Sequence, residues 1–215
     1  RESKYRILNN IMLRLKKYFQ HFFFKTSKYS QAGQDLFAIE LFGSNGTYID
    51  VGAGVPIKDS NTYMLEVEKN WRGFSVEILG KYKNLWVNSP ERSNRIYWED
   101  AINFDYKKAI FENNLTNDID FLSCDIDPQE DTFLVLKKVI NDGIRPKFIA
   151  FETDYYQVSK DYSKLAYSFL EPYGYEFAVK NVYSNLKRNK IFETWFVKKS
   201  LNFETLEYNQ WVKKF

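Results

Sequence analysis

Thr47-Tyr48-Ile49-Asp50-Val51-Gly52-Ala53-Gly54 joins a short apolar run to a glycine-rich loop. The run is typical of a buried strand, and the loop begins where that strand ends. Glycines let a backbone approach a ligand closely, and in open α/β sheets ligands bind outside the carboxyl ends of the strands. The stretch therefore predicts a strand, a tight loop and a ligand site beside the loop.

Between Gly46 and Val197, short β-rich apolar runs alternate with helical patterns. This alternation is typical of an α/β fold, in which helices cover both faces of a sheet. We expect seven strands, at residues 47–51, 73–78, 95–102, 119–125, 147–152, 175–180 and 192–198. We expect helices at residues 34–42, 61–69, 81–88, 132–141 and 158–170, with Ser60 capping the second and Asp131 the fourth.

The composition fits a single globular domain, because 44% of the 215 residues are hydrophobic and 27% are charged. The lone Cys124 excludes an internal disulfide, and no Cys/His cluster is present to hold zinc. No apolar run approaches the roughly 20 residues of a membrane span, and the N-terminus lacks the long apolar core of a secretory signal. We expect a soluble domain with no transmembrane segment, in the cytoplasm.

The N-terminal segment is strongly basic, because eight of its first 28 residues are Lys or Arg and only Glu2 is acidic. Residues 1–29 are interpreted as a basic helix or linker, and residues 30–215 as the main domain. The amphipathic stretch 7–24 either contacts a membrane surface or a partner, or packs on the domain. The net charge of +3 is too small to indicate nucleic acid, and we expect no nucleic-acid partner. From the start at Arg1 we expect a processed protein or a piece of a longer polypeptide.

The glycine-rich loop differs from both common phosphate-binding patterns. A dinucleotide fingerprint needs a small residue three positions after Gly54, where Ile57 stands. The Gly-Lys-Ser/Thr ending of a P-loop is missing as well. The loop therefore predicts a ligand without a pyrophosphate.

Acidic residues end the next two expected strands. Glu77 can accept hydrogen bonds from both hydroxyls of a ribose. Asp100 can accept from the exocyclic amine of an adenine, while Ala101 leaves room for the ring. Together with Asp50, these acids and the glycine loop favour S-adenosylmethionine, whose sulfonium and amine are cationic.

Several motifs resemble those of the FkbM-type methyltransferases, in the same order and spacing, over about residues 30–198. They are Ser30-Gln31-Ala32-Gly33-Gln34-Asp35-Leu36-Phe37, Tyr48-Ile49-Asp50-Val51-Gly52-Ala53, Ser60-Asn61-Thr62-Tyr63, Trp71-Arg72-Gly73 and Val76-Glu77. Residues 119–127 and 145–152 resemble the family's fourth and fifth strands. The resemblance implies the Rossmann-like class I methyltransferase fold, with a seven-stranded, mostly parallel sheet. It also implies S-adenosylmethionine as methyl donor and a hydroxyl acceptor on a sugar or a secondary metabolite.

The resemblance also implies that Gln31 and Asn61 lie near the methionine part of the donor. The expected cofactor-binding residues are therefore Gln31, Asp50, Gly52, Ala53, Gly54, Asn61, Glu77, Asp100 and Ala101. One motif departs from the family, which commonly has Asp-Val-Glu-Gly after its fourth strand. This chain has Asp125-Ile126-Asp127-Pro128 there, and Pro128 stiffens the loop beside the acceptor.

Four acids are expected at one rim of the sheet, after the fourth and fifth strands. They are Asp125, Asp127, Glu152 and Asp154. Oxygen ligands without His or Cys suit Mg²⁺ or Mn²⁺, so Asp125, Glu152 and Asp154 are candidate metal ligands. The alternative is that these acids cap loops in solvent. The general base is expected to be Asp127, with Asp125 as second candidate.

We expect an S-adenosylmethionine-dependent O-methyltransferase with a carbohydrate acceptor, a sugar hydroxyl of a glycan or glycolipid. Such a domain can be fused to glycosyltransferase domains in a viral or bacterial glycan-synthesis polyprotein. Two alternatives stay open. One is a methyltransferase of a small metabolite or lipid, and the other is a catalytically silent relative that binds nucleosides or a partner protein.

Overall fold

A computed structural model describes residues 27–153, 160–183 and 190–212. Most of the basic segment 1–29, the candidate metal ligand Asp154 and the first residues of the helix expected at 158–170 lie outside these ranges. None of the helices within the described ranges is long and apolar enough to cross a membrane.

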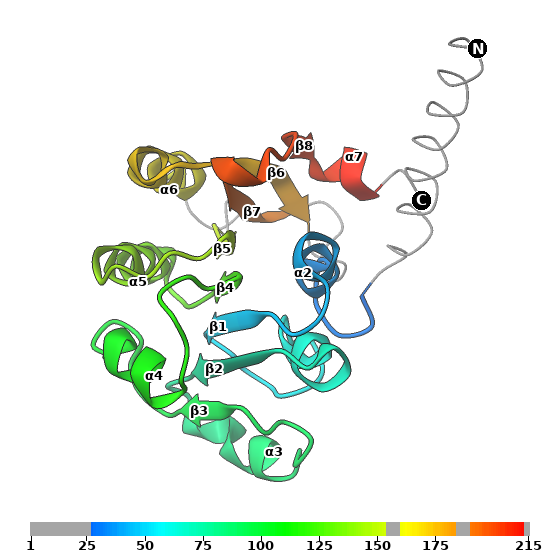
Figure 1. Cartoon of the computed structure of the whole chain (residues 1–215), viewed down its shortest axis with the longest axis vertical. Coiled ribbons are helices and arrows are strands. Elements are labelled where there is room, and N and C mark those ends of the chain that lie inside the picture. The colour runs from blue at the N-terminus through cyan, green and yellow to red at the C-terminus, as the bar shows by residue number, and fades with distance from the viewer. Residues whose placement is uncertain (1–26, 154–159, 184–189, 213–215) are drawn as a thin grey trace, which may run out of the picture.

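The described strands form one sheet in the order β3-β2-β1-β4-β5-β7-β6-β8 (Figure 1). Strands β1 to β5 pair in parallel, and β7 runs antiparallel to both β5 and β6. The carboxyl ends of β1, β2, β4 and β5 therefore meet at one edge. The strands are β1 (Thr47–Val51), β2 (Arg72–Val76), β3 (Arg95–Tyr97), β4 (Phe121–Cys124), β5 (Phe148–Glu152), β6 (Tyr175–Tyr183), β7 (Ile191–Lys198) and β8 (Leu206–Glu207).

Helices cover both faces of the sheet, with α4, α5 and α6 along one side and α2 on the other (Figure 1). The longer helices are α2 (Gln34–Phe42), α4 (Tyr106–Glu112), α5 (Gln129–Asn141) and α6 (Tyr162–Leu170). The shorter ones are the π-helix η1 (Met64–Glu68), α3 (Lys83–Val87), α7 (Tyr208–Val212) and the 3-10 turns η2 (Gly80–Tyr82), η3 (Glu171–Tyr173) and η4 (Lys199–Leu201).

The inner strands β1, β4, β5, β6 and β7 contribute buried residues to two cores, whereas β2 contributes to one and the edge strands β3 and β8 are largely not buried. In β1, Ile49 and Val51 join the core under α4 to α6, whereas Tyr48 joins the core under α2. Burying a large apolar side chain typically contributes about 1.5–3 kcal/mol. This two-sided burial explains why the strands are continuous apolar runs.

The α/β fold and all seven expected strands are confirmed, and the helix expected at 34–42 has the bounds of α2. The described residues contain an eighth strand, the two-residue β8, which is too short to show a pattern. Helix α4 was also not expected. The third strand ends at Tyr97, because Asp100 makes local hydrogen bonds that form a turn instead.

The expected helix ends are confirmed only in part. The hydroxyl of Ser60 accepts a hydrogen bond from the Tyr63 amide at 3.2 Å, as expected for a cap, although the segment continues as the π-helix η1. The cap expected at Asp131 is wrong. Helix α5 begins at Gln129, directly after Pro128, so Asp131 lies in its first turn, where a negative charge favours the helix dipole.

Candidate cofactor and active site

Gly52 and Gly54 both have positive φ angles, of 78° and 56°, but they meet different surroundings. A Cβ atom on Gly52 would lie 1.6 Å from the carbonyl oxygen of Asp125. A Cβ on Gly54 would meet no described atom within 4 Å. Gly52 is therefore required by the close approach of the β1 and β4 ends, and the loop is open at Gly54.

The carboxylate of Glu77 holds the open end of this loop. Its Oε2 accepts a hydrogen bond from the Gly54 amide at 2.8 Å, and its Oε1 accepts from the Leu79 amide at 2.6 Å. Trp86 donates from Nε1 to the Gly54 carbonyl at 2.9 Å. Each oxygen of an ionised carboxylate has a second acceptor position. Glu77 thus fixes the loop and can still accept hydrogen bonds from a ligand.

A buried group of hydrogen-bonded side chains supports the loop from below, and we call it the Arg92 network. The Nε of Arg92 lies 2.7 Å from Glu66 Oε2, and its Nη2 donates to Thr62 Oγ1 at 3.0 Å. Thr62 in turn donates to Asp50 Oδ2 at 2.7 Å. The network consists of Tyr48, Asp50, Ser60, Thr62, Glu66 and Arg92.

Asp50 belongs to this network and is only 3% exposed. Burial raises its pKa above the ordinary value of 3.8, while the hydrogen bond from Thr62 and the charge of Arg92 oppose that rise. Its carboxylate accepts from Thr62 within the interior. Asp50 therefore shapes the loop from inside the protein, and its predicted contact with the cofactor stays a prediction.

Asn61 is 9% exposed and donates from Nδ2 to Ser123 Oγ at 3.0 Å. Its Oδ1 is buried and has no hydrogen-bond partner among the described residues. A buried acceptor that lacks a partner typically costs about 1–3 kcal/mol. The amide therefore presents an unsatisfied acceptor, which a ligand with an N–H or O–H group can satisfy.

Asp100 and Ala101 lie in the turn after β3. Both oxygens of Asp100 already accept local hydrogen bonds, from the Ile102 amide at 3.0 Å and from Asn103 Nδ2 at 2.6 Å. Ala101 is buried. The structure thus places this pair beyond the end of the strand, and their predicted contact with adenine stays a prediction.

The sequence reasoning missed a buried acid on β7. Glu193 is 1% exposed, and its Oε1 accepts from Gln34 Nε2 at 2.8 Å while its Oε2 accepts from Trp195 Nε1 at 2.7 Å. It stands opposite Glu152 in the β5–β7 ladder. The signal in the sequence that could have identified this acid is a glutamate inside an otherwise apolar strand. The hydrogen bond from Gln34 to Glu193 holds the start of α2 close to the end of β5. The expected ligand Gln31 lies three residues before Gln34.

The predicted metal site finds no support in the residues that the structure describes. Among them, no three His, Cys, Asp or Glu side chains converge as ligands, and the third candidate, Asp154, lies outside the described ranges. Asp125 is half-buried and Glu152 is buried, whereas Asp127 is exposed. Asp127 lies directly before Pro128, after which α5 begins.

No family model and no curated protein sequence matches the chain. Solved structures match it at low identity. The Dnmt2 methyltransferase of S. pombe has a TM-score of 0.54 and 12% identity, over 75% of this chain and 51% of that one. The small RNA methyltransferase HEN1 has a TM-score of 0.50 and 14% identity, over 81% of this chain and 25% of that one.

The fibrillarin pre-rRNA processing protein of Methanococcus jannaschii has a TM-score of 0.50 and 14% identity, over 72% of this chain and 66% of that one. The chain thus spans only a quarter of HEN1 and half of Dnmt2. Likeness at this level shows the fold and not the substrate. The protein has the Rossmann-like fold of the class I S-adenosylmethionine-dependent methyltransferases.

Proposed function

We propose that the protein is an S-adenosylmethionine-dependent O-methyltransferase that acts on a sugar hydroxyl of a glycan or glycolipid. The observation that carries the donor assignment is Glu77, which follows β2 and accepts from the amide of Gly54 in the neighbouring loop. The sugar acceptor and the hydroxyl chemistry rest on the resemblance to the FkbM-type methyltransferases.

The residues around the loop fit this donor. Glu77 accepts from the ribose hydroxyls, and the unsatisfied Oδ1 of Asn61 accepts from the amino group of the methionine part. Ile78 follows Glu77 and is 64% exposed, so it offers an apolar surface to the adenine. The sequence reasoning missed Ile78, although its place after the ribose ligand was a usable signal.

The donor supplies an electrophilic methyl group, and the protein positions the acceptor oxygen in line with it. Deprotonation of that oxygen falls to a carboxylate after β4. Asp125 is the better placed candidate, because its backbone carbonyl lies against Gly52 and its amide donates to Val51 at 3.0 Å. Asp127, which is exposed, is the second candidate. Asp125→Asn should then lower kcat more than Asp127→Asn does.

Glu77→Gln tests the donor site by calorimetry with S-adenosylmethionine and S-adenosylhomocysteine. Losing hydrogen bonds to a charged acceptor costs about 1.5–3 kcal/mol, so we expect affinity to fall roughly ten- to a hundredfold. The matched control is Glu99→Gln, because Glu99 is an exposed acid close to the next strand end. If Glu77→Gln binds the donor as tightly as the native protein does, the ribose assignment is wrong.

Incubation with labelled donor tests the acceptor. We expect label in oligosaccharides and glycolipids, at an oxygen that mass spectrometry of the fragments identifies. Label in RNA or in small metabolites alone would overturn the sugar acceptor, although the protein would still be a methyltransferase. Donor binding without turnover on any of these classes would favour the silent relative.

A further inference from the structure

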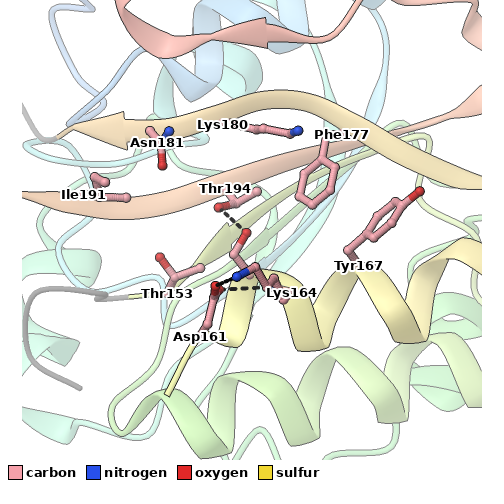
Figure 2. Close-up of a pocket in the computed structure, with 10 residues that line it drawn as sticks. Thr153, Asp161, Lys164, Tyr167, Phe177, Lys180, Asn181, Ile191 and Thr194 are labelled. Atoms are coloured by element: carbon pink, nitrogen blue, oxygen red, sulfur yellow. Dashed lines mark hydrogen bonds and ion pairs between the residues drawn. The ribbon is translucent and has the colours of Figure 1, made fainter. Parts of the chain in front are cut away.

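A cavity lies between α6 and the strands β6 and β7 (Figure 2). It lies away from the loop of Gly52 and Gly54, which we call the cofactor loop. Its volume is about 480 Å³, which is within the range of about 300–1,000 Å³ typical of small-molecule sites. It lies on the side of the sheet that α4, α5 and α6 cover. Glu152, Glu193 and the start of α2 lie on the other side.

One wall of this cavity is aromatic. The rings of Tyr167 on α6 and Phe177 on β6 stack with their centroids 4.4 Å apart and an interplanar angle of 23°. Lys180 holds its Nζ 4.5 Å from the centre of the Phe177 ring. Among the described residues Lys180 has no acidic partner, so its charge is available to a ligand at this wall.

The floor and the opposite wall are polar. Thr153 and Thr194 are buried, and Thr194 Oγ1 donates to Ser163 Oγ at 3.0 Å. Asp161 caps α6 by accepting from the Lys164 amide at 3.1 Å, and the Nζ of Lys164 lies 3.2 Å from its Oδ2. The charge of Lys164 is therefore already balanced, which leaves Lys180 as the cation that faces a ligand.

We propose that this cavity binds one acidic pyranose, a hexuronic acid residue, of the acceptor glycan. A pyranose has an apolar C–H face and a rim of hydroxyls, which match an aromatic wall that faces hydroxyl and carboxylate groups. The sugar carboxylate pairs with Lys180. This inference rests on the proposed sugar acceptor.

The topology places this sugar at a distance from the transferred methyl group. Strands lie about 4.8 Å apart, so β1 and β6, which are separated by β4, β5 and β7, lie about 19 Å apart. The cavity nevertheless reaches the edge at which the cofactor loop emerges, because Thr153 directly follows β5. The cavity therefore holds a residue further along the glycan and not the ring that is methylated.

Titration of the ¹⁵N-labelled full chain with methyl β-D-glucuronide and methyl β-D-glucoside tests this, in the absence of donor. We expect the glucuronide to bind about tenfold more tightly, with the largest amide shifts at Thr194 and Asn181. In Lys180→Met, which keeps an apolar stem over Phe177, this preference should be lost. The control is Lys137→Met, because Lys137 lies 4.7 Å over the Phe133 ring on α5, outside the cavity.

Equal affinity for the two glycosides, binding of neither, or a preference that persists in Lys180→Met would overturn the proposal. Calorimetry measures the affinity of each variant for S-adenosylhomocysteine separately, and we expect this affinity to equal that of the native protein. If the native protein binds S-adenosylhomocysteine but does not bind the glucuronide, this proposal alone fails. Loss of donor binding in the native protein identifies a failure of the proposed function.

Discussion

Two regions on the α2 side of the sheet are held together in opposite ways. The Arg92 network under the cofactor loop is built from directed hydrogen bonds and one buried ion pair. Between α2, β5, β7 and α7, the same side is filled by an aromatic cluster of Phe37, Phe148, Trp195, Trp211 and Phe203. Rings can shift and repack, but each bond of a buried polar network fixes one geometry.

The difference shows which region of the protein is held in a single conformation. A buried ion pair is often no more stabilising than apolar residues of equal size, yet removing one partner leaves an uncompensated charge. The Arg92 network lies where a loop must be held within fractions of an ångström for a ligand. The aromatic cluster only has to keep α2 and α7 on the sheet.

Gly52→Ala should break the loop region most severely. The new Cβ would overlap the backbone carbonyl of Asp125, and the left-handed conformation adds a further cost, so we expect a loss of about 5 kcal/mol. Urea unfolding followed by circular dichroism measures this. Gly54→Ala is the control, because it has a positive φ but open space, and should cost about 1–2 kcal/mol. Similar losses in both variants would contradict the close-approach argument.

Arg92→Met tests the polar side of the comparison. It leaves the buried carboxylate of Glu66 without its cation, so we expect the free energy of unfolding to fall by about 3–5 kcal/mol. Donor affinity should fall as well, because Thr62 and Ser60 lose their donor. Arg95→Met removes the exposed pair with Glu112 and should cost at most about 1 kcal/mol. A loss of that small size for Arg92→Met would mean that the network is not needed for stability.

Phe37→Leu tests the aromatic side. Phe37 contacts four other rings. Losing these contacts should lower the free energy of unfolding by about 1–2 kcal/mol, since the cluster can partly close around leucine. Donor affinity should not change. Phe111→Leu, at a side chain that is 82% exposed, should stay within about 0.5 kcal/mol of the native protein. If Phe37→Leu weakened donor binding, the two regions would be coupled.

The smallest expected effect is the pH dependence that Asp50 contributes. The folded state raises its pKa above 3.8, so the folded protein binds this proton more tightly than the unfolded chain does. Stability from this group is present at low pH and is lost as pH rises through the raised pKa. Urea unfolding across the acidic range should show the native protein losing stability relative to Asp50→Asn as pH rises. The opposite trend would mean that Asp50 is stabilised as the carboxylate.

Local patterns were sufficient for much of the fold and part of the site. The strands, the bounds of α2 and the positions of Gly52, Gly54 and Glu77 all follow from apolar runs and the residues that end them. The bounds of β3 and α5 did not follow, because local hydrogen bonds of Asp100 and the ring of Pro128 decided them. The hydrogen bond between Thr62 and Asp50 did not follow either, because no local pattern marks that pairing.

The sequence by itself determined that this protein is an α/β domain with a glycine loop and an acid at adjacent strand ends. Those features depend on neighbours within a few residues, and their signals are local. Only the tertiary structure decided that the backbone of Asp125 lies against Gly52, that Arg92 pairs with Glu66, and that Tyr167 stacks on Phe177 at one wall of a cavity. The physical reason is that burial and pairing depend on which segments come into contact although they are far apart in the chain. Local patterns in a single sequence do not indicate those contacts.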